Sequence, residues 1–421
     1  MSLRSFGRFG PSCFLRYYKA HMSNVSGKLS EIQNELRAAG VDGWLLYDFK
    51  RSNDLACAFL EIPHDSILTR RMYYWIPADG SPVKLLNAIE SHTLDHQSGE
   101  LSLYQTWQDL DAGLTKLLAG KKRVAMEYSP RGAIPAVSKV DGGTIDLVRE
   151  KGVEVVSSAN LLQLFTGIWN KGKLESHLFA ARVLDEVVEK AWNKIEASLK
   201  KGELVTEYDI QQYILRLFKE NDCVASDAPI CAVNANSANP HYQPSKKHSF
   251  PIKKGDFILI DLWCKQNKPH AVYADITRVG VAGTPSPKQK EVFEIVREAQ
   301  QAALDLVQKS FADKKPLQGY QVDQASRNVI EKSGYGKYFI HRTGHNIDEN
   351  DHGNGTHIDN FETHDTRLII PGTCFSIEPG IYLPGEFGVR LEYDVFIHWD
   401  SKVQVTGGQQ KEIRCLEVCS E

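Results

Sequence analysis

The sequence of 421 residues predicts an α+β fold in which two similar α-α-β-β halves follow a smaller α/β domain. Two observations predict the halves. Residues 254–261 (KGDFILID) resemble residues 371–378 (PGTCFSIE), and two helix-like segments precede each of these apolar runs. A third observation predicts the smaller domain: short apolar runs alternate with helical or loop segments before residue 170.

The smaller domain is expected over residues 28–170. Its first helix is indicated by Leu29, Ile32 and Leu36, which have helical spacing, and Gly40 is its expected stop. No phosphate-binding glycine loop occurs in this domain. Its strands are predicted by short apolar runs at 44–47, 73–76, 83–86, 124–128 and 153–156.

The larger domain is expected over residues 171–421, after the polar boundary at 170–173. A long amphipathic helix is predicted for 174–199. The second helix begins at Thr206, where Thr206 and Asp209 have the spacing of a capping box. Two further helices are predicted for 287–309 and 321–333, so that a helix pair precedes each strand pair.

Composition and charge exclude several classes of function. Fifty basic and 53 acidic side chains give a net charge of −3, which argues against a nucleic-acid-binding surface. No apolar stretch approaches the length of a membrane span, so no membrane partner is expected. The eight cysteines include no C-x-x-C pair, which favours free thiols in a reducing compartment such as the cytoplasm.

The first 27 residues form a basic tail without any acidic residue. Arginine, lysine, serine and aromatic residues dominate it, which is the composition of an organelle transit peptide. A disordered tail explains the same composition, so import into an organelle stays open beside a cytoplasmic location.

Four carboxylates indicate a metal site. Asp261 and Asp275 are 14 residues apart on strand-like sequence at 257–262 and 272–277. Glu378 and Glu392 repeat that spacing in the second half, where strands are expected at 375–377 and 389–395. Carboxylates on strands this apolar are rarely buried unless they are paired or bound to metal. Four of them converging without cations would repel one another, and divalent ions would neutralise them.

Five histidines lie within 24 residues: His341, His345, His352, His357 and His364. Gly344 precedes His345 and allows the backbone to approach closely there. His357 and His364 are expected to be ordinary solvated loop residues.

Five motifs in order resemble the pita-bread metallopeptidases, the family of aminopeptidase P, prolidase, methionine aminopeptidase and the metal-free creatinase. The resemblance covers about 174–400, with weaker similarity to the creatinase-type N-terminal domain over 28–165. The motifs are IDLW (260–263), YADITR (273–278), His341–His352, SIEPG (376–380) and GVRLE (388–392).

The resemblance implies a dinuclear metal centre. Asp261 matches a ligand of one ion, His345 and Glu378 match ligands of the other, and Asp275 and Glu392 match the bridging carboxylates. One imidazole with four carboxylates suits Mn²⁺, our first choice, or Co²⁺, Zn²⁺ or Fe²⁺. Five protein ligands fit two ions about 3.5–4 Å apart.

The resemblance also implies an activity, hydrolysis of the bond between an N-terminal residue and proline by a metal-bound hydroxide, as in aminopeptidase P or prolidase. Glu378 matches the general base. The residues that favour the Xaa-Pro branch are His241, His341, His352 and Arg390. The expected partners are a peptide substrate of the Xaa-Pro type and a second copy of the chain, since dimers are common in this family.

Two departures keep alternatives open. The family commonly has glycine where this chain has Asn346 and Asp348, so these residues are expected to adopt glycine-like turns unless the loop has shifted. The altered loop bears on the substrate pocket. A hydrolase or lyase with a non-peptide substrate is therefore the second hypothesis, and a catalytically inactive binding module is the third.

Overall fold

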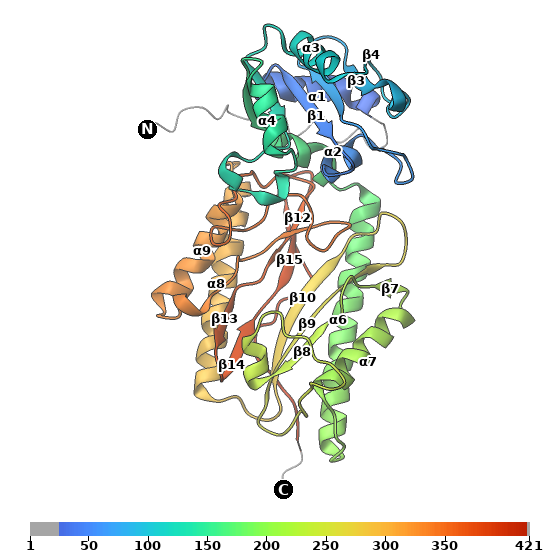
Figure 1. The fold of residues 1–421 in the computed structure, drawn as a ribbon. Helices are drawn as coiled ribbons and strands as arrows, with labels where there is room; N and C mark the ends of the chain where they lie inside the picture. Colours follow the sequence, from blue (N-terminus) through green and yellow to red (C-terminus); the bar gives the residue numbers. More distant parts are fainter. Residues whose placement is uncertain (1–24, 419–421) are drawn as a thin grey trace. The chain divides into compact units, whose positions relative to one another are not determined.

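The computed structural model describes residues 25–418, which contacts divide into two compact units, Met1–Thr166 and Gly167–Glu421. Figure 1 shows the chain coloured along the sequence. Residues 1–24 of the expected basic tail lie outside the described part, as do Cys13 and Cys419. The domains expected at 28–170 and 171–421 stay a prediction.

The first unit is built on a six-stranded mixed sheet with the order β4-β3-β2-β1-β5-β6. Strand pairs β1–β2 and β2–β3 are antiparallel, and the other three pairs are parallel. Its strands are β1 (Gly43–Asp48), β2 (Met72–Pro77), β3 (Val83–Asn87), β4 (Glu100–Tyr104), β5 (Arg123–Met126) and β6 (Glu154–Ser157).

Helices cover both faces of this sheet, because successive strand residues point to opposite sides. Trp44 and Leu46 pack with the first helix on one face, whereas Leu45 and Tyr47 join a separate cluster on the other. The helices are α1 (Val25–Ala38), α2 (Asp54–Phe59), α3 (Trp107–Leu118), α4 (Gly142–Arg149) and α5 (Ala159–Leu162).

The sequence predicted five of these six strands and missed β4. This strand lies at the sheet edge, where Leu101 and Leu103 are half exposed. A short edge strand with one polar and one exposed apolar face lacks the continuous apolar run that marked the others. Gly40 follows the first helix with a φ of +63°, as expected for a helix stop.

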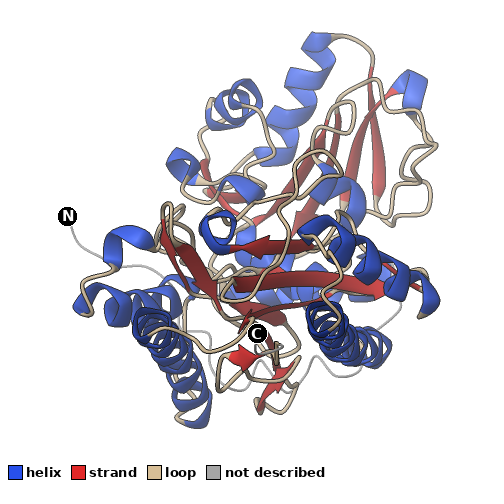
Figure 2. Cartoon of the chain, turned by 90° about the horizontal axis from the view of Figure 1, so that it is seen from below, coloured by secondary structure: helices blue, strands red, loops and turns tan. Residues whose placement is uncertain are grey.

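The second unit repeats a helix pair followed by a strand pair. The first half contains α6 (Lys171–Lys200), α7 (Glu207–Glu220), β9 (Phe257–Gln266) and β10 (Ala274–Val281). The second contains α8 (Pro287–Ala312), α9 (Gly319–Lys332), β12 (Cys374–Ile377) and β15 (Tyr393–Ile397). Figures 1 and 2 show the two helix pairs flanking the strands.

Local sequence explains where these helices begin. The hydroxyl of Thr206 accepts a hydrogen bond from the Asp209 backbone at 3.2 Å, and the Asp209 carboxylate accepts one from the Thr206 backbone at 2.9 Å. The predicted capping box is therefore confirmed. Ser286 and Gln289 form a second box, with Pro287 at the first helical position of α8.

Shorter strands complete the second unit. Strands β7 (Cys223–Val224) and β8 (Ile230–Val233) each pair with β9, and β17 (Arg414–Cys415) pairs with β10. The second sheet has the order β11-β12-β15-β16, with β11 at Asn346–Ile347 and β16 at Val403–Thr406. A separate hairpin joins β13 (Gly380–Leu383) to β14 (Phe387–Arg390).

One strand boundary differs from the prediction. The run from 389 to 395 was expected to be one strand, but Leu391 and Glu392 lie between β14 and β15, where the chain passes from the hairpin to the second sheet. Leu391 packs into the core beside β9, whereas Glu392 joins the candidate site. The two halves also differ in strand register. Ile260 and Ile377 are equivalent in the repeat, but Ile260 lies opposite Arg278, whose equivalent is Val395, whereas Ile377 lies opposite Tyr393.

Two further sequence expectations concern cysteines and membranes. The six described cysteines form no disulfide, and all except Cys415 are buried. Within residues 25–418, no helix combines the length and apolar character needed to cross a bilayer.

Candidate metal centre

The alternation of strand residues places the first two acids on one face. Ile260 and Leu262 pack against α6 and α7, so Asp261 between them points away from that core. Asp275 does the same, because its neighbours Ala274 and Ile276 also belong to that core. Both carboxylates are buried and face the second half of the unit, where Asp261 pairs with Arg390 and Asp275 lies 3.9 Å from His345.

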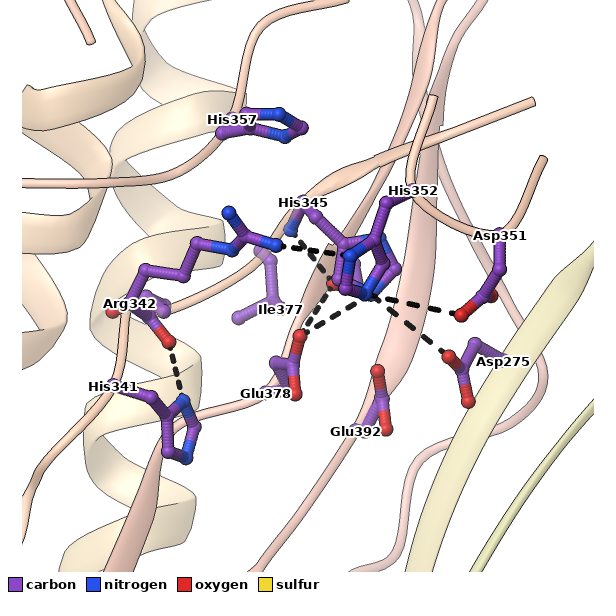
Figure 3. Close-up of polar contacts among 12 residues, drawn as sticks. Asp275, His341, Arg342, His345, Asp351, His352, His357, Ile377, Glu378 and Glu392 are labelled. Carbon is purple, nitrogen blue, oxygen red and sulfur yellow. Dashed lines mark hydrogen bonds and ion pairs between the residues drawn. The ribbon is translucent and has the colours of Figure 1, made fainter. Parts of the chain in front are cut away.

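Asp275 meets His345 and Glu392 in a buried group whose ligating atoms all lie within 4.8 Å of one another. Glu378 lies beside this group, with Oε1 3.4 Å from Nε2 of His345. Figure 3 shows these four side chains converging from separate strands and loops. Of the five predicted ligands, four therefore lie together.

The backbone around His345 is fixed by close contact with β12. A Cβ atom on Gly344 would lie 2.0 Å from the carbonyl oxygen of Ser376, so only glycine fits there. The His345 backbone N–H donates to the Ser376 hydroxyl at 3.0 Å, and the Ser376 N–H donates to the His345 carbonyl at 2.9 Å. This pairing holds the imidazole over the acids.

Asp261 joins the group through hydroxyl and guanidinium contacts. Arg390 forms an ion pair with its Oδ2, and the Thr277 hydroxyl lies 3.0 Å from its Oδ1. The same hydroxyl lies 2.7 Å from Oε2 of Glu392. Thr277 therefore links a carboxylate of each half. The sequence interpretation missed it, although a two-residue step from Asp275 puts it on the same strand face.

The electrostatics of the group favour cations. Burial, then the neighbouring Glu392 carboxylate, raises the pKa of Asp275 well above its usual range. Burial and Glu378 do the same for the pKa of Glu392. Burial keeps the pKa of His345 well below its usual range, so its imidazole is neutral and has a lone pair to share.

The donor set fits divalent metal ions. Oδ1 of Asp275 and Oε1 of Glu392 are buried, and neither has a hydrogen-bond partner within the described residues. Buried oxygens without partners are costly, and a metal ion would satisfy both. The chemistry is oxygen-rich with one imidazole, which matches hard or borderline divalent ions.

The predicted histidines outside the ligand set differ in environment. Nδ1 of His341 lies 2.6 Å from the Arg342 carbonyl, so it carries the proton, and Nε2 accepts a hydrogen bond from the Tyr382 hydroxyl at 2.7 Å. Burial lowers the pKa of His341 to about 3.

His352 is exposed, and Arg342 Nη2 lies 3.3 Å from its Nδ1. His241 is exposed on the first half, near enough for its charge to act on Asp261.

A sequence profile of metallopeptidase family M24 matches residues 176–398, more than half of the chain. The chain belongs to metallopeptidase family M24. The predicted family is thereby confirmed.

Curated relatives of this M24 chain include two Xaa-Pro dipeptidases. The Lactobacillus helveticus protein is 37% identical over 186 residues, 42% of this chain and 46% of the relative. The Lactobacillus delbrueckii subsp. lactis protein is 35% identical over 229 residues, 52% of this chain and 55% of the relative. The chain thus spans about half the length of these relatives.

Solved structures resemble the M24 chain over nearly its whole length. Dipeptidase PepE from Mycobacterium ulcerans has a TM-score of 0.66 at 23% identity and covers 98% of this chain and 100% of its own. A prolidase from Thermococcus sibiricus has a TM-score of 0.60 at 25% identity, covering 94% and 100%. These likenesses confirm the predicted α+β pita-bread fold class.

The altered M24 loop does not use glycine-like backbone at the two substituted positions. Neither Asn346 nor Asp348 has a positive φ, which excludes left-handed turns and leaves the other expected alternative, a shifted loop. Asn346 instead pairs with β12 as part of β11, and its side-chain amide donates to the Cys374 carbonyl at 2.8 Å. Its Oδ1 accepts from the Gly355 N–H at 2.9 Å.

Glycines further along the loop make room for this asparagine. A Cβ atom on Gly353 would lie 2.3 Å from Asn346 Oδ1, and one on Gly355 would lie 2.6 Å from its Nδ2. Asp348 is anchored separately, through an ion pair of 2.7 Å with Lys173 at the start of α6. The loop after His345 is therefore remodelled around a larger side chain.

His357 corrects a second expectation, since it is buried and not solvated. Its Nδ1 accepts a hydrogen bond from the Asn346 N–H at 3.1 Å, which ties it to the same loop. His364 is exposed as expected, and its ring lies 4.3 Å from that of Tyr320.

The sequence interpretation also missed Asp351, Arg342 and Tyr382. Tyr382 contacts both His341 and Arg390, with its hydroxyl 3.2 Å from Arg390 Nη1. Asp351 and Arg342 lie on either side of the His352 ring. For Asp351 and Arg342 the available signal was their position next to His352 and His341 in the sequence.

Proposed function

We propose that this M24 protein hydrolyses the peptide bond between an N-terminal residue and a following proline, with two divalent metal ions as cofactors. The observation that carries the proposal is the buried group of Asp275, His345 and Glu392, with Glu378 beside it. The names of the two curated relatives, both Xaa-Pro dipeptidases, support the proline-directed activity.

The ions would be held by Asp261, Asp275, His345, Glu378 and Glu392. We propose Mn²⁺ first, and Co²⁺, Zn²⁺ or Fe²⁺ as alternatives, because carboxylates and one imidazole suit all of them. When bound, such a pair of ions polarises the scissile carbonyl and makes a water molecule nucleophilic at neutral pH.

Glu378 would move the proton. Burial raises the pKa of this carboxyl to about 7, although Arg390 opposes the shift. A carboxylate placed beside the ligand group can accept a proton from water bound there and return it to a leaving group. Glu378 would accept the proton of the attacking water at a carboxylate oxygen and pass it to the leaving proline nitrogen. The Ser376 hydroxyl, 3.1 Å from its Oε1, orients it.

The remaining predicted residues would bind and orient the substrate. Arg342 faces Nδ1 of His352 as a donor, so the ring proton of neutral His352 resides on Nε2 and can bind the carbonyl oxygen. Although one side of the His352 ring is open to solvent, desolvation by the surrounding protein and the charge of Arg342 lower its pKa to about 4, which keeps the ring neutral. Arg390 and His341 would position Asp261 and Tyr382, and His241 would line the site from the first half.

Arg342 supports a dipeptide as the substrate. Its half-buried guanidinium contacts His352 and forms no ion pair with the described residues. An unpaired guanidinium beside a peptide site suits a carboxylate, here that of a C-terminal proline. We therefore propose Xaa-Pro dipeptides as preferred substrates over longer Xaa-Pro-Xaa peptides.

Hydrolysis assays with the metal-loaded protein test the proposal. Xaa-Pro dipeptides should be cleaved faster than Xaa-Pro-Xaa tripeptides and far faster than Xaa-Ala. Metal analysis should find two ions per chain, and Asp275→Ala should remove most of the rate, because the proposed bridge would be lost. Equal cleavage of Xaa-Ala and Xaa-Pro, or of neither, would reject proline specificity.

Cleavage of no peptide would move the second hypothesis, a non-peptide hydrolase or lyase, ahead of peptidase activity. Full metal occupancy without any turnover would favour the binding module. The expected homodimer and the cytoplasmic or organellar location stay predictions, which sedimentation of the purified protein and localisation of a C-terminally tagged chain would test.

A further inference from the structure

Asp351 is an acid at the candidate site that no role above uses. It directly precedes His352, and its Oδ2 lies 3.8 Å from Nε2 of that ring. Figure 3 shows it on the Asp275 side of the histidine pair, opposite Arg342. Its Oδ1 atom is buried and has no hydrogen-bond partner among residues 25–418.

Among the described side chains, acids outnumber bases around Asp351. Three other carboxylates, Asp261, Glu378 and Asp227, act on it, and only Arg342 among its main charged neighbours opposes them. Among the residues that the structure describes, its side chain caps no helix, and its one ion-pair approach is at 3.8 Å to His352, which is neutral. A carboxylate that is costly to the fold and makes few contacts is typical of a functional position.

The two ends of the His352 ring face opposite charges. Arg342 lies at Nδ1 and Asp351 lies at Nε2. If Nε2 binds the scissile carbonyl, the α-amino group of the same residue is one carbon away from that carbonyl, on the Asp351 side. The C-terminal carboxylate then extends toward Arg342.

We propose that Asp351 binds the α-ammonium group of the substrate's N-terminal residue and so restricts cleavage to substrates with a free amino terminus. This inference rests on the proposed function. Asp351 would be a specificity-determining residue that contacts the substrate, outside the ligand set of the metal ions. A charged hydrogen bond from an ammonium group would satisfy its buried Oδ1.

The test compares Ala-Pro with propanoyl-Pro, which lacks only the α-amino group. The metal-loaded wild-type protein should prefer Ala-Pro, measured as the ratio of the two kcat/KM values. Asp351→Asn should reduce this ratio by at least about tenfold, the scale of losing one charged partner. Asp351→Glu should retain part of the preference because it keeps the charge.

Asp227→Asn is the matched control, since it removes an exposed acid whose charge acts on Asp351. Because salt screens an exposed charge, Asp227→Asn should keep the ratio of the two kcat/KM values within about twofold of wild type. Metal content is measured for every variant. Asp351→Asn should retain both ions, and loss of an ion would overturn the inference by making Asp351 a ligand.

The two levels of proposal fail differently. If the wild-type protein does not cleave Ala-Pro, the proposed function fails and this inference falls with it. If it cleaves Ala-Pro but Asp351→Asn and Asp351→Glu both keep the wild-type ratio, only the role of Asp351 is rejected. Reduced turnover of both substrates to the same extent would equally reject it, because a merely structural role would act on both.

Discussion

The rings of His345 and His352 lie 4.1 Å apart between centroids, at an interplanar angle of 49°. One is a proposed ligand, buried against the acids, and the other is exposed at the side of the site. Their contact means that a peptide carbonyl bound to His352 would lie next to the proposed metal ions.

His352→Ala should therefore lower kcat by about 10²–10³-fold, the range for losing one donor to a developing oxyanion. Metal content should stay unchanged, because His352 is not a proposed ligand. His364→Ala, which removes an exposed histidine of the same segment, is the control and should leave kcat at the wild-type value. An unchanged kcat in His352→Ala would rule out its proposed contact with the carbonyl.

Metal ions should stabilise the protein more at high pH than at low pH. The folded carboxyls of Asp275 and Glu392 have raised pKa values, so the folded state binds protons that the unfolded state releases. Without metal, the stability that these two carboxyls contribute is fully present below their unfolded pKa, about 4, and is lost as pH rises through the folded values. Metal replaces those protons.

Calorimetry with and without added Mn²⁺ measures this effect. The increase in Tm on adding Mn²⁺ should be larger at about pH 8 than at about pH 5, since protons compete for the carboxylates at the lower pH. Chelator should reverse it. An increase in Tm that is the same at both pH values, or larger at about pH 5, would contradict the assignment of these carboxylates as ligands.

Lys173 should stabilise the loop that carries Asp348. The pair is 2.7 Å long, and the side chains of Lys173 and Asp348 are only 16% and 13% exposed. Lys173→Met should lower the free energy of unfolding by about 3 kcal/mol, because it leaves a carboxylate buried without its partner. Adding Asp348→Leu should recover part of that loss in denaturant titrations.

The control for this pair is Lys315→Met. Lys315 pairs with Asp313 at 3.3 Å, but its side chain is 70% exposed. Its removal should change the free energy of unfolding by less than about 1 kcal/mol. Equal losses of unfolding free energy in both variants would show that burial does not determine how much the Lys173–Asp348 pair contributes.

Gly353 should be intolerant of a side chain as long as Asn346 is present. Gly353→Ala should destabilise the protein by about 1–3 kcal/mol, the cost of overpacking, because Asn346 is held by hydrogen bonds at both ends of its amide. Adding Asn346→Gly should restore part of the stability. Gly142→Ala, at a position with nothing within 4 Å of the added Cβ, is the control for chain entropy.

Local patterns explain what could be predicted from the sequence. Helical spacing predicted all four helices of the second unit, and Thr206 with Asp209 marked a true start because a capping box depends on residues three apart. The ligand positions followed from motifs. Strand β4 was missed because its pattern lacks a buried apolar run.

Long-range contacts could not be predicted in the same way. Arg390 reaches Asp261 across 129 residues of chain, and the burial of His357 depends on a loop folded over it. The sequence left two alternatives open for the loop at Asn346, because the glycines that make room for its side chain lie several residues further along. Such relationships are set by tertiary packing, which a residue's own neighbours do not encode.

The division of the acids between two halves has a consequence for how the chain folds. The hairpin of β9 and β10 can form early, because its strands are close in sequence, and it then holds two acids but no imidazole. The second half must later bring Glu378 and Glu392 against them, so like charges oppose the last docking step. We therefore expect newly synthesised chains in a metal-poor cell to pause with the two halves undocked, exposed to proteases and aggregation, until ions become available.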